Sequence, residues 1–515
     1  MKSVKYYLTG FLFLAFLGMV NHSCTNLDEE IFSDLDGETF FDNPDNLIFA
    51  FGTVYTNMYW TFGNKYGVGR DCGTDLTVVP QRHGDWFDGG EWHRYHRLEW
   101  TPSDSYIEFW WNLMYKGVNL CNSLIFQFEA VGTEEANIAI AELRAFRALY
   151  YYWLMDVFGN VPLVTKFDVP ADFAPSTNSR AEVFSFIEQE LIESMPLLVK
   201  EHSLATYGRV NWYVAQMTLA KMYLNAEVYT GTAQWEKAET ALDAIISSGE
   251  FSLPTDYFAS FKDDGWLSDE VILGVPMDET KALGLEVHLF SLHYNLQEKF
   301  GMGQLPWNGM AVQESLFNLF EENDIRRNGL LFGPQLDAEG APIEDPDWER
   351  FDPTCPTCPK DTDGAGVNLT PFINELEPDC IRQAGARVFK WQIEPGSERY
   401  LSNDVPVFRY ADVLLMKAEV LIRLGRDSEA PAFFNMVRQR AGVADLPIIT
   451  LDDILDERAR ELFVEGHRRT DLIRFGKYLG TRWEKDEVSP DHVILWPIPQ
   501  AQISANGNLD QNPGY

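Results

Sequence analysis

Three tryptophans in glycine- and proline-rich segments are the side chains best suited to hold a ligand. Trp86, Trp92 and Trp307 lie where no helical spacing accounts for them. A flat indole ring can stack on a sugar ring or on another amphipathic molecule, because its face is apolar and its edge carries a donor. Packing inside a loop is the alternative for each ring. We therefore predict that these three residues form stacking surfaces.

Charged residues near the first two rings could add hydrogen bonds. Asp75, Arg82 and Arg94 carry carboxylate and guanidinium groups that pair well with hydroxyls, although exposed surface charge is the commoner role. The run from Trp92 to Arg97 is locally basic and could suit an acidic glycan. We predict that Asp75, Arg82 and Arg94 contact a carbohydrate.

Metal and catalytic motifs are weak. The segment Asp361-Thr362-Asp363-Gly364 resembles part of a calcium loop, but it lacks the third acidic position and the later glutamate, so a solvated acidic turn is favoured over Ca²⁺ binding by Asp361 and Asp363. Zinc needs about four ligands, and Cys355 and Cys358 have only Cys380 and no histidine nearby in sequence, which favours a local disulfide or unpaired thiols. We find no serine-hydrolase, phosphate-loop or zinc-protease motif. The sequence predicts no cofactor and no catalysis.

Charge limits the kinds of partner. The 515-residue chain carries 41 basic and 78 acidic residues, for a formal net charge of −37. Such a surface repels nucleic acid, so we expect no nucleic-acid partner. Aromatic residues make up 14% of the chain, which leaves rings available for a ligand after the core is filled.

The amino terminus has the pattern of an export signal. Lys2 and Lys5 precede an uncharged run from Tyr6 to Val20, which is too short for an ordinary membrane-spanning helix. Bacterial lipoprotein signals end at a cysteine that becomes the acylated first residue, and Cys24 is in that position. We predict a signal peptide over residues 1–23 and lipidation of Cys24, with a plain cleaved signal as the alternative. The acidic residues 28–30 resemble a signal for export to the cell surface.

The helical pattern centres on residues 141–164. Ala141, Ala145 and Ala148 recur at helical spacing and form a face almost without side chains, while the neighbouring face is aromatic. Gly159 favours a helix end. This spacing predicts a helix that lets another helix approach closely and whose rings lie in the core.

Periodicity divides the rest of the chain into helical and irregular regions. Helical spacing predicts a mainly α fold with tetratricopeptide-like hairpins. The predicted parts are a helical scaffold (32–60, 106–250 and 405–480), an aromatic loop (61–105), an inserted irregular subdomain with a ligand-facing surface where it meets that loop (251–404) and an irregular end (481–515). Within the irregular subdomain, only residues 311–328 have a clear helical pattern.

Three glutamates recur at four-residue spacing near the carboxy-terminal end of the scaffold. Glu457, Glu461 and Glu465 alternate with arginines, a pattern typical of a solvated or salt-bridged helix face. The sequence leaves both alternatives open.

Several ordered motifs resemble one protein family. They are Cys24, Arg147-Ala148, Phe158 to Leu163, Gly208-Arg209, Arg409 to Glu419, Asn435 to Gly442, Glu457 to Leu462, Glu465 to Arg468, Asp471 to Lys477, Trp496 to Pro499 and Gln511 to Tyr515. In this order the chain resembles the SusD/RagB family of outer-membrane lipoproteins from Bacteroidetes. The resemblance implies one SusD-like domain over residues 24–515. It also implies anchoring at the outer membrane, exposure at the cell surface and non-catalytic capture of oligosaccharides for a SusC-like TonB-dependent transporter.

Three other functions remain open at this point. A repeat-type scaffold would bind a protein partner and use its aromatic rings only in the core. A glycan hydrolase would need two positioned carboxylates, which spacing alone cannot identify among 78 acidic residues. A family member could also take peptides or glycopeptides in the same uptake role. The sequence does not identify the glycan.

Overall fold

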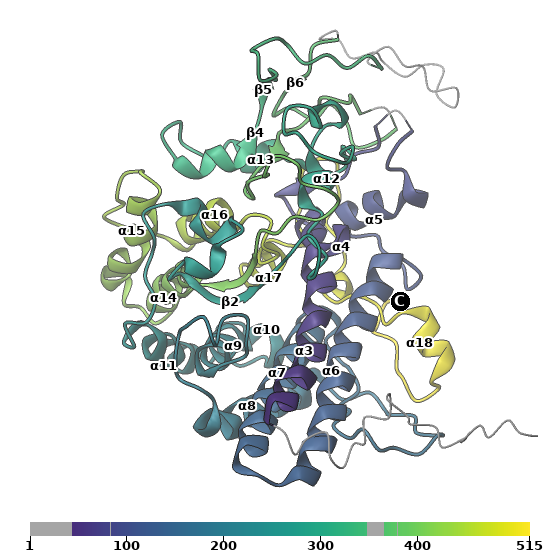
Figure 1. The fold of residues 1–515 in the computed structure, drawn as a ribbon, viewed down its shortest axis with the longest axis vertical. Helices are drawn as coiled ribbons and strands as arrows, with labels where there is room; N and C mark the ends of the chain where they lie inside the picture. The colour runs from purple at the N-terminus through teal and green to yellow at the C-terminus, as the bar shows by residue number, and fades with distance from the viewer. Residues whose placement is uncertain (1–43, 83, 348–364, 379) are drawn as a thin grey trace, which may run out of the picture. The chain divides into compact units, whose positions relative to one another are not determined.

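The computed structural model describes residues 44–82, 84–347, 365–378 and 380–515 (Figure 1). The chain divides into two compact units, Met1–Leu47 and Ile48–Tyr515. Of the first unit, only residues 44–47 are described, and they begin helix α3. The predicted signal peptide, Cys24, Asp361 and Asp363 lie outside the described residues. Within the described ranges, no helix has both the length and the apolar composition needed to cross a membrane.

The amino-terminal scaffold consists of helices that pack in pairs. Its helices are α3 (Pro44–Gly63), α6 (Ser105–Val131), α7 (Glu134–Phe158), α8 (Arg180–Ser194), α9 (Trp212–Leu224), α10 (Ala226–Thr230) and α11 (Trp235–Ile246). Helix α7 packs on α6 and α8, and α9 packs on α11. Figure 1 shows α3, α6 and α7 alongside one another, and the Tyr55 and Phe146 rings stack between α3 and α7 at 4.7 Å. The mainly helical prediction is confirmed.

The alanine face of helix α7 is buried in the structure. Ala145 and Ala148 are fully buried, and Ala141 is 4% exposed. At a different face of α7, helix α6 approaches closely, because a Cβ added at Gly117 of α6 would lie 2.2 Å from the Tyr150 ring. A larger side chain at Gly117 would therefore push α6 away from α7. Gly159 follows the helix with a positive φ of 72°, which a glycine adopts without strain.

The carboxy-terminal helices complete the scaffold. They are α14 (Tyr410–Arg423), α15 (Pro431–Arg440), α16 (Leu451–Leu462), α17 (Arg468–Arg474) and α18 (Gln500–Ala505), with short 3₁₀ turns at Asp427–Glu429 and Asp491–Ile494. Helix α14 packs on α15, α16 and the amino-terminal helix α11. Helices α14 and α15 thus form one of the predicted helix hairpins, and α14 joins the two helical regions.

The predicted aromatic loop 61–105 is wrong in part, because several short elements interrupt it. The structure has α4 (Lys65–Val68), β1 (Thr77–Val78), α5 (Glu91–Arg97) and 3₁₀ turns at Gly69–Gly73 and Asp88–Gly90. These elements are too short for a hydrophobic period to emerge. Helix α5 is held by packing instead, since Trp92 and Tyr95 are 2% and 3% exposed.

The region 251–404 is irregular, as predicted. Its elements are β2 (Val271–Val275), α12 (Val287–Ser291), β3 (Ala311–Val312), α13 (Glu314–Phe317), β4 (Leu330–Leu331), β5 (Gly333–Pro334), β6 (Asn368–Leu369) and β7 (Arg387–Val388). Apart from the 3₁₀ turn Met195–Leu197, which follows α8, the 3₁₀ turns of this region lie at Tyr257–Phe261, Gly265–Leu267, Tyr294–Leu296 and Ile325–Gly329. The predicted helix 311–328 is wrong, because strand β3 and the last of these turns leave only α13 as α-helix. Neighbouring sheet and turn contacts override the local spacing there.

Short antiparallel sheets connect these regions. Strand β2 pairs with β8 (Val405–Arg409), so the irregular region is attached directly to the start of α14. Strand β1 pairs with β3, with Thr77 opposite Val312. The remaining pairs are β4 with β7 and β5 with β6. The β1–β3 pair brings the 61–105 segment against the irregular region, where a ligand-facing surface was predicted.

The regularly spaced glutamates form a buried salt-bridged face, so the solvated alternative is wrong. Glu457 and Glu461 are fully buried, and Glu465 is 3% exposed. Glu461 pairs with Arg326 and Arg409 at 3.1 and 2.9 Å and also with Arg440. Burial alone would raise the pKa of Glu461, but the three arginines hold it well below its ordinary value. This cluster joins the irregular region to α15 and α16.

Candidate functional site

An open cleft lies where the end of α3 and the 64–88 segment meet the irregular region. Its volume is about 540 Å³, within the range of about 300–1,000 Å³ typical of ligand sites. It is lined by Trp60, Asn64, Lys65, Tyr66, Asp85, Trp86, Asp88, Glu286, Tyr294, Leu305, Pro306, Trp307 and Arg399. Five of these residues are aromatic, and we call this site the aromatic cleft.

The backbone around Trp86 and Trp307 fixes both rings. Trp86 has a positive φ of 64°, and its indole N–H donates to the Trp307 carbonyl oxygen at 2.6 Å. Trp86 is only 9% exposed, whereas Trp307 is half-buried, so Trp86 forms the base of the cleft. A Cβ added at Gly309 would lie 2.6 Å from the Trp86 ring, so glycine is required for this close approach.

Half-exposed rings form the remaining walls. Trp60 is 40% exposed, and Tyr66 and Tyr294 are half-buried. The Tyr294 hydroxyl donates to Asp85, which orients the phenol. Burial, and then the nearby Asp85 carboxylate, raise the pKa of Tyr294, so its hydroxyl stays protonated at neutral pH. Rings presented this way, with carboxylates beside them, suit a ligand that has flat apolar faces and many hydroxyls.

Ion pairs border the cleft. Arg399 contacts Glu286 at 2.8 Å, and its guanidinium lies 5.9 Å from the Trp307 ring centre. Lys65 lies 3.5 Å from Asp88. Among the described residues, no group of three or more His, Cys, Asp or Glu side chains could hold a metal ion. The cleft can bind and orient a polar ring ligand through these groups.

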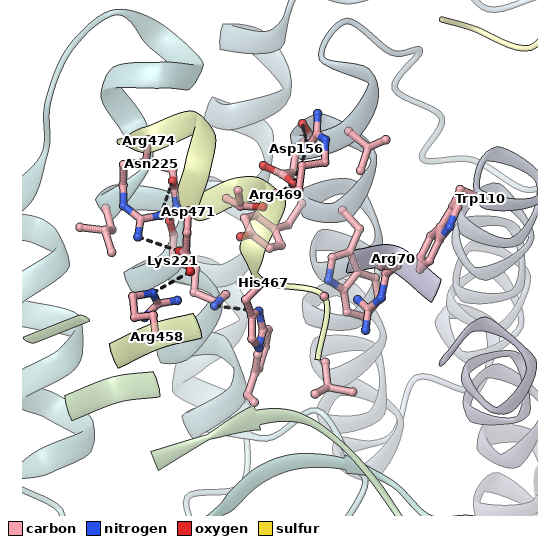
Figure 2. A pocket seen from close by; sticks show the side chains of 18 of the residues that line it. Arg70, Trp110, Asp156, Lys221, Asn225, Arg458, His467, Arg469, Asp471 and Arg474 are labelled. Carbon is pink, nitrogen blue, oxygen red and sulfur yellow. Dashed lines mark hydrogen bonds and ion pairs between the residues drawn. The ribbon is translucent and has the colours of Figure 1, made fainter. Parts of the chain in front are cut away.

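A second cavity lies inside the molecule, between the amino-terminal scaffold helices and α17. Figure 2 shows Lys221, Asp471 and Arg474 on one side of it and Arg70 and Trp110 on the other. Its volume is about 80 Å³, which is room for a few water molecules and too little for an oligosaccharide.

The charges around this internal cavity mostly neutralise one another. Lys221 pairs with Asp412 at 2.6 Å, Arg469 with Asp156 at 3.1 Å and Arg474 with Asp471 at 2.8 Å (the last two in Figure 2). Burial lowers the pKa of His467 to about 3, so the imidazole is neutral there. Paired ions around so small a cavity indicate a structural role. The aromatic cleft is therefore the better candidate for ligand binding.

Comparison with known families agrees with the fold. Residues 384–492 match the model of the SusD family, and residues 53–224 match a model described as starch-binding associating with outer membrane. Together these matches span more than half of the chain. The chain belongs to the SusD/RagB family.

Individual SusD-family proteins extend the likeness over nearly the whole chain. The starch-binding protein SusD of Bacteroides thetaiotaomicron is 27% identical over 460 residues, which cover 81% of this chain and 80% of that protein. The SusD-like protein P38 of Formosa agariphila is 24% identical and covers 100% of both chains. The surface glycan-binding protein A of B. thetaiotaomicron, solved with laminarihexaose, has a TM-score of 0.71 at 23% identity and covers 91% of this chain and 99% of its own.

Two of the predicted stacking residues of this SusD-family chain come together in the cleft. Trp86 and Trp307 are 221 positions apart in sequence, yet they share a hydrogen bond. The prediction that Trp92 stacks on a ligand is wrong, because its ring is 2% exposed. Trp92 packs behind Trp86 and Phe290, with ring centres 6.5 and 5.4 Å apart. Its contribution to the site is to support Trp86.

The prediction that Arg82 binds hydroxyls is also wrong, because the residue is 1% exposed. Its guanidinium donates to the carbonyl oxygens of Asn308, Ile381 and Ala384 at 2.9, 2.7 and 2.9 Å. Asn308 directly follows Trp307, so Arg82 fixes the backbone that carries one wall of the cleft.

Asp75 and Arg94 do not line the aromatic cleft. Both Asp75 oxygens accept from Arg468, at 2.8 and 2.7 Å, beside a separate hollow of about 360 Å³. Arg94 pairs with Asp104 and donates to the Gly89 carbonyl oxygen at 2.8 Å. The charged groups of Asp75 and Arg94, which were predicted to bind hydroxyls, are thus engaged in contacts within the protein.

Sequence reasoning missed the other residues that line the cleft, among them Trp60, Tyr66, Tyr294 and Arg399. Trp60 lies on α3, within the predicted helical scaffold 32–60, where no residue was singled out as a ligand contact. Tyr294 and Arg399 lie in the aperiodic region, where no local signal separates a cleft residue from a packed one. Only the run of glycines near Tyr66 hinted that chain segments approach one another there.

Proposed function

We propose that this SusD-family chain is a glycan-binding lipoprotein that captures oligosaccharides in the aromatic cleft without catalysis. The observation that carries this proposal is the gathering of five aromatic residues and several hydrogen-bonding groups around one open volume of about 540 Å³. Sugar rings present apolar faces and hydroxyl edges, which such a surface complements. The relatives named as starch-binding and glycan-binding proteins support the same conclusion.

The proposal extends to delivery and location. We infer that Cys24 is acylated and anchors the protein at the outer face of the outer membrane, where captured glycan passes to a SusC-like TonB-dependent transporter. The export pattern of residues 1–24 and the outer-membrane description of the matching family model support this role. Membrane fractionation tests the anchor, since Cys24→Ala should release the protein, and co-purification of a barrel transporter with the lipidated chain tests the partner.

Affinity electrophoresis and calorimetry on a panel of polysaccharides test glycan capture. Trp307→Ala should weaken binding at least tenfold, or about 1.4 kcal/mol, because it removes one exposed face of the cleft. Trp235→Ala on α11 is the control, since it removes another half-buried tryptophan outside the cleft. Both variants should remain folded by circular dichroism. Equal retention of Trp307→Ala and wild type would assign glycan binding elsewhere.

Three outcomes would replace this function. Capture of a transporter with no retention on any glycan would favour a protein-interaction scaffold. Binding of peptides or glycopeptides in place of glycans would keep the uptake role and change its substrate. Release of reducing sugar by the purified protein would make it a hydrolase. We expect binding to be unchanged by a chelator, because the proposal needs no metal, and a loss of binding in EDTA would instead favour Ca²⁺ at Asp361 and Asp363.

A further inference from the structure

The most exposed cation of the aromatic cleft has a buried carboxylate as its partner. The Arg399 side chain is 49% exposed, whereas that of Glu286 is 3% exposed. The Arg399 Nε and one terminal nitrogen both contact the same Glu286 oxygen at 2.8 Å. Glu286 is therefore held in position from inside the protein, and it neutralises a cation that faces the ligand space.

The second cation of the cleft is also compensated. Lys65 lies 3.5 Å from Asp88 and within 5.5 Å of the Trp86 ring centre. A third carboxylate, Asp85, accepts from the Tyr294 hydroxyl and the Trp86 amide. The lining thus contains three carboxylates and two cations, so its formal charge is negative.

This arrangement penalises anionic ligands. A sulfate or uronate that bound Arg399 would have to compete with Glu286, and Glu286 is too buried to be fully hydrated if it lost its partner. The protein's net charge of −37 adds a long-range repulsion. A hydroxyl needs no such exchange, because it can donate to a carboxylate or accept from a guanidinium while the ion pair stays intact.

We propose that the aromatic cleft selects uncharged glycans and that Glu286 determines this choice by neutralising Arg399. The inference rests on the proposed glycan-binding function, and it deepens that function by naming the class of glycan and the residue that sets it. Glu286 acts through Arg399 here and is a positioning residue that also sets local charge.

Matched pairs of polysaccharides test the selectivity. Laminarin, starch and xylan would each be compared with their sulfated derivatives, by affinity electrophoresis and calorimetry, in buffers of low and physiological ionic strength. We expect wild type to bind a neutral member at least tenfold more tightly than its sulfated form. Tighter binding of a sulfated form would overturn the inference while the glycan-binding function stands. If none of these glycans, neutral or sulfated, bound to the protein, the proposed function itself would be overturned.

The variant Glu286→Gln tests the role of the carboxylate. Without its partner charge, Arg399 should bind the sulfated glycan at least threefold more tightly than in wild type. This gain should shrink as salt is added, because the new contact is ionic. The decisive quantity is the ratio of the affinity for the sulfated glycan to that for its neutral form, which should rise at least threefold over wild type. An unchanged affinity for the sulfated form would show that Glu286 does not set the selectivity.

Two further variants separate local charge from net charge. Glu279→Gln removes an exposed carboxylate on the chain leading to Glu286, outside the cleft, and should leave both affinities unchanged. The double variant Glu286→Gln/Arg399→Gln should lose the gain for sulfated glycan. A gain that persists in the double variant would exclude Arg399 as its source and overturn the mechanism. Thermal unfolding of each variant verifies the fold, and the wild-type comparison of matched glycans needs no variant.

Discussion

The glutamate cluster of α16 and the aromatic cleft use the same kinds of side chain in opposite settings. Around Glu461, the arginines Arg326, Arg409 and Arg440 are almost entirely removed from water. In the cleft, Arg399 and Lys65 also pair with carboxylates, but their side chains are 49% and 31% exposed. Rings accompany both sets, since Arg409 lies 5.2 Å from the Phe261 ring centre and Arg399 lies 5.9 Å from that of Trp307.

The difference lies in which groups could exchange their partners for a ligand. A buried ion that loses its partner has no water to replace it, so the α16 cluster must stay intact and serves to join the irregular region to the scaffold. An exposed cation can exchange carboxylate, water and ligand oxygen at a much lower energetic cost. Burial separates the structural charges from those that can meet a ligand.

The largest effect should come from Glu461→Gln, which removes one charge from the buried cluster and leaves its arginines undercompensated. We expect a loss of at least about 3 kcal/mol in the free energy of unfolding, the cost typical of breaking a buried ion pair. Urea denaturation measures this loss. Glu236→Gln on α11 is the control, because Glu236 is exposed and should change stability by less than about 0.5 kcal/mol. Equal stability of the two variants would show that the cluster is not structural.

Neutralising a buried carboxylate that has no arginine partner should stabilise the protein at neutral pH, whereas neutralising Glu461 should destabilise it. Asp404 is 3% exposed and accepts from the Tyr207 hydroxyl at 2.7 Å and the Met277 amide at 3.0 Å. No ion pair of Asp404 is seen in the described part of the chain. Burial raises its pKa to about 6, although the Tyr207 hydrogen bond opposes the shift.

The sign of the pH dependence follows from that shift. Between about pH 4 and pH 6 the native state holds the Asp404 proton more tightly than the unfolded chain does, so this residue's contribution to stability falls as pH rises, by up to about 1.4 kcal/mol per pH unit. Asp404→Asn should therefore match wild type below about pH 4 and exceed it at pH 7 by at least about 1 kcal/mol. Denaturation at several pH values measures the difference, and parallel curves for the two proteins would contradict the assignment.

The sequence predicted the packed helical scaffold better than the aromatic cleft. Helix α7 and the α14–α15 hairpin have long hydrophobic periods, and on α7 Ala148 and Gly159 indicated burial and the helix end directly. For Glu457 and Glu461, spacing could not separate solvent from a buried salt bridge, because the arginines that bury them come partly from distant segments. Arg326 is 135 positions from Glu461.

The cleft depends on contacts that local sequence cannot reveal. The absence of a helical period selected Trp86 and Trp307, which both line the cleft, yet the same criterion selected Trp92, whose burial is decided by Trp86 and Phe290 packing over it. Trp60 failed the criterion because it belongs to α3. Burial and exposure at these sites are properties of the assembled fold.

The smallest predicted effect tests whether a tryptophan contributes to glycan binding through its exposure alone or through its position in the cleft. Trp60 and Trp266 are 40% and 41% exposed, but only Trp60 lines the aromatic cleft. Trp60→Ala should weaken glycan binding about threefold to tenfold, or roughly 0.6–1.4 kcal/mol, since it removes one rim surface and leaves the Trp86–Trp307 pair in place. Trp266→Ala should leave binding unchanged, and both variants should unfold within a few degrees of wild type. Equal losses of binding in the two variants would mean that any exposed indole contributes and that the cleft has no special role. A loss confined to Trp60→Ala would place the ligand along the wall that α3 contributes.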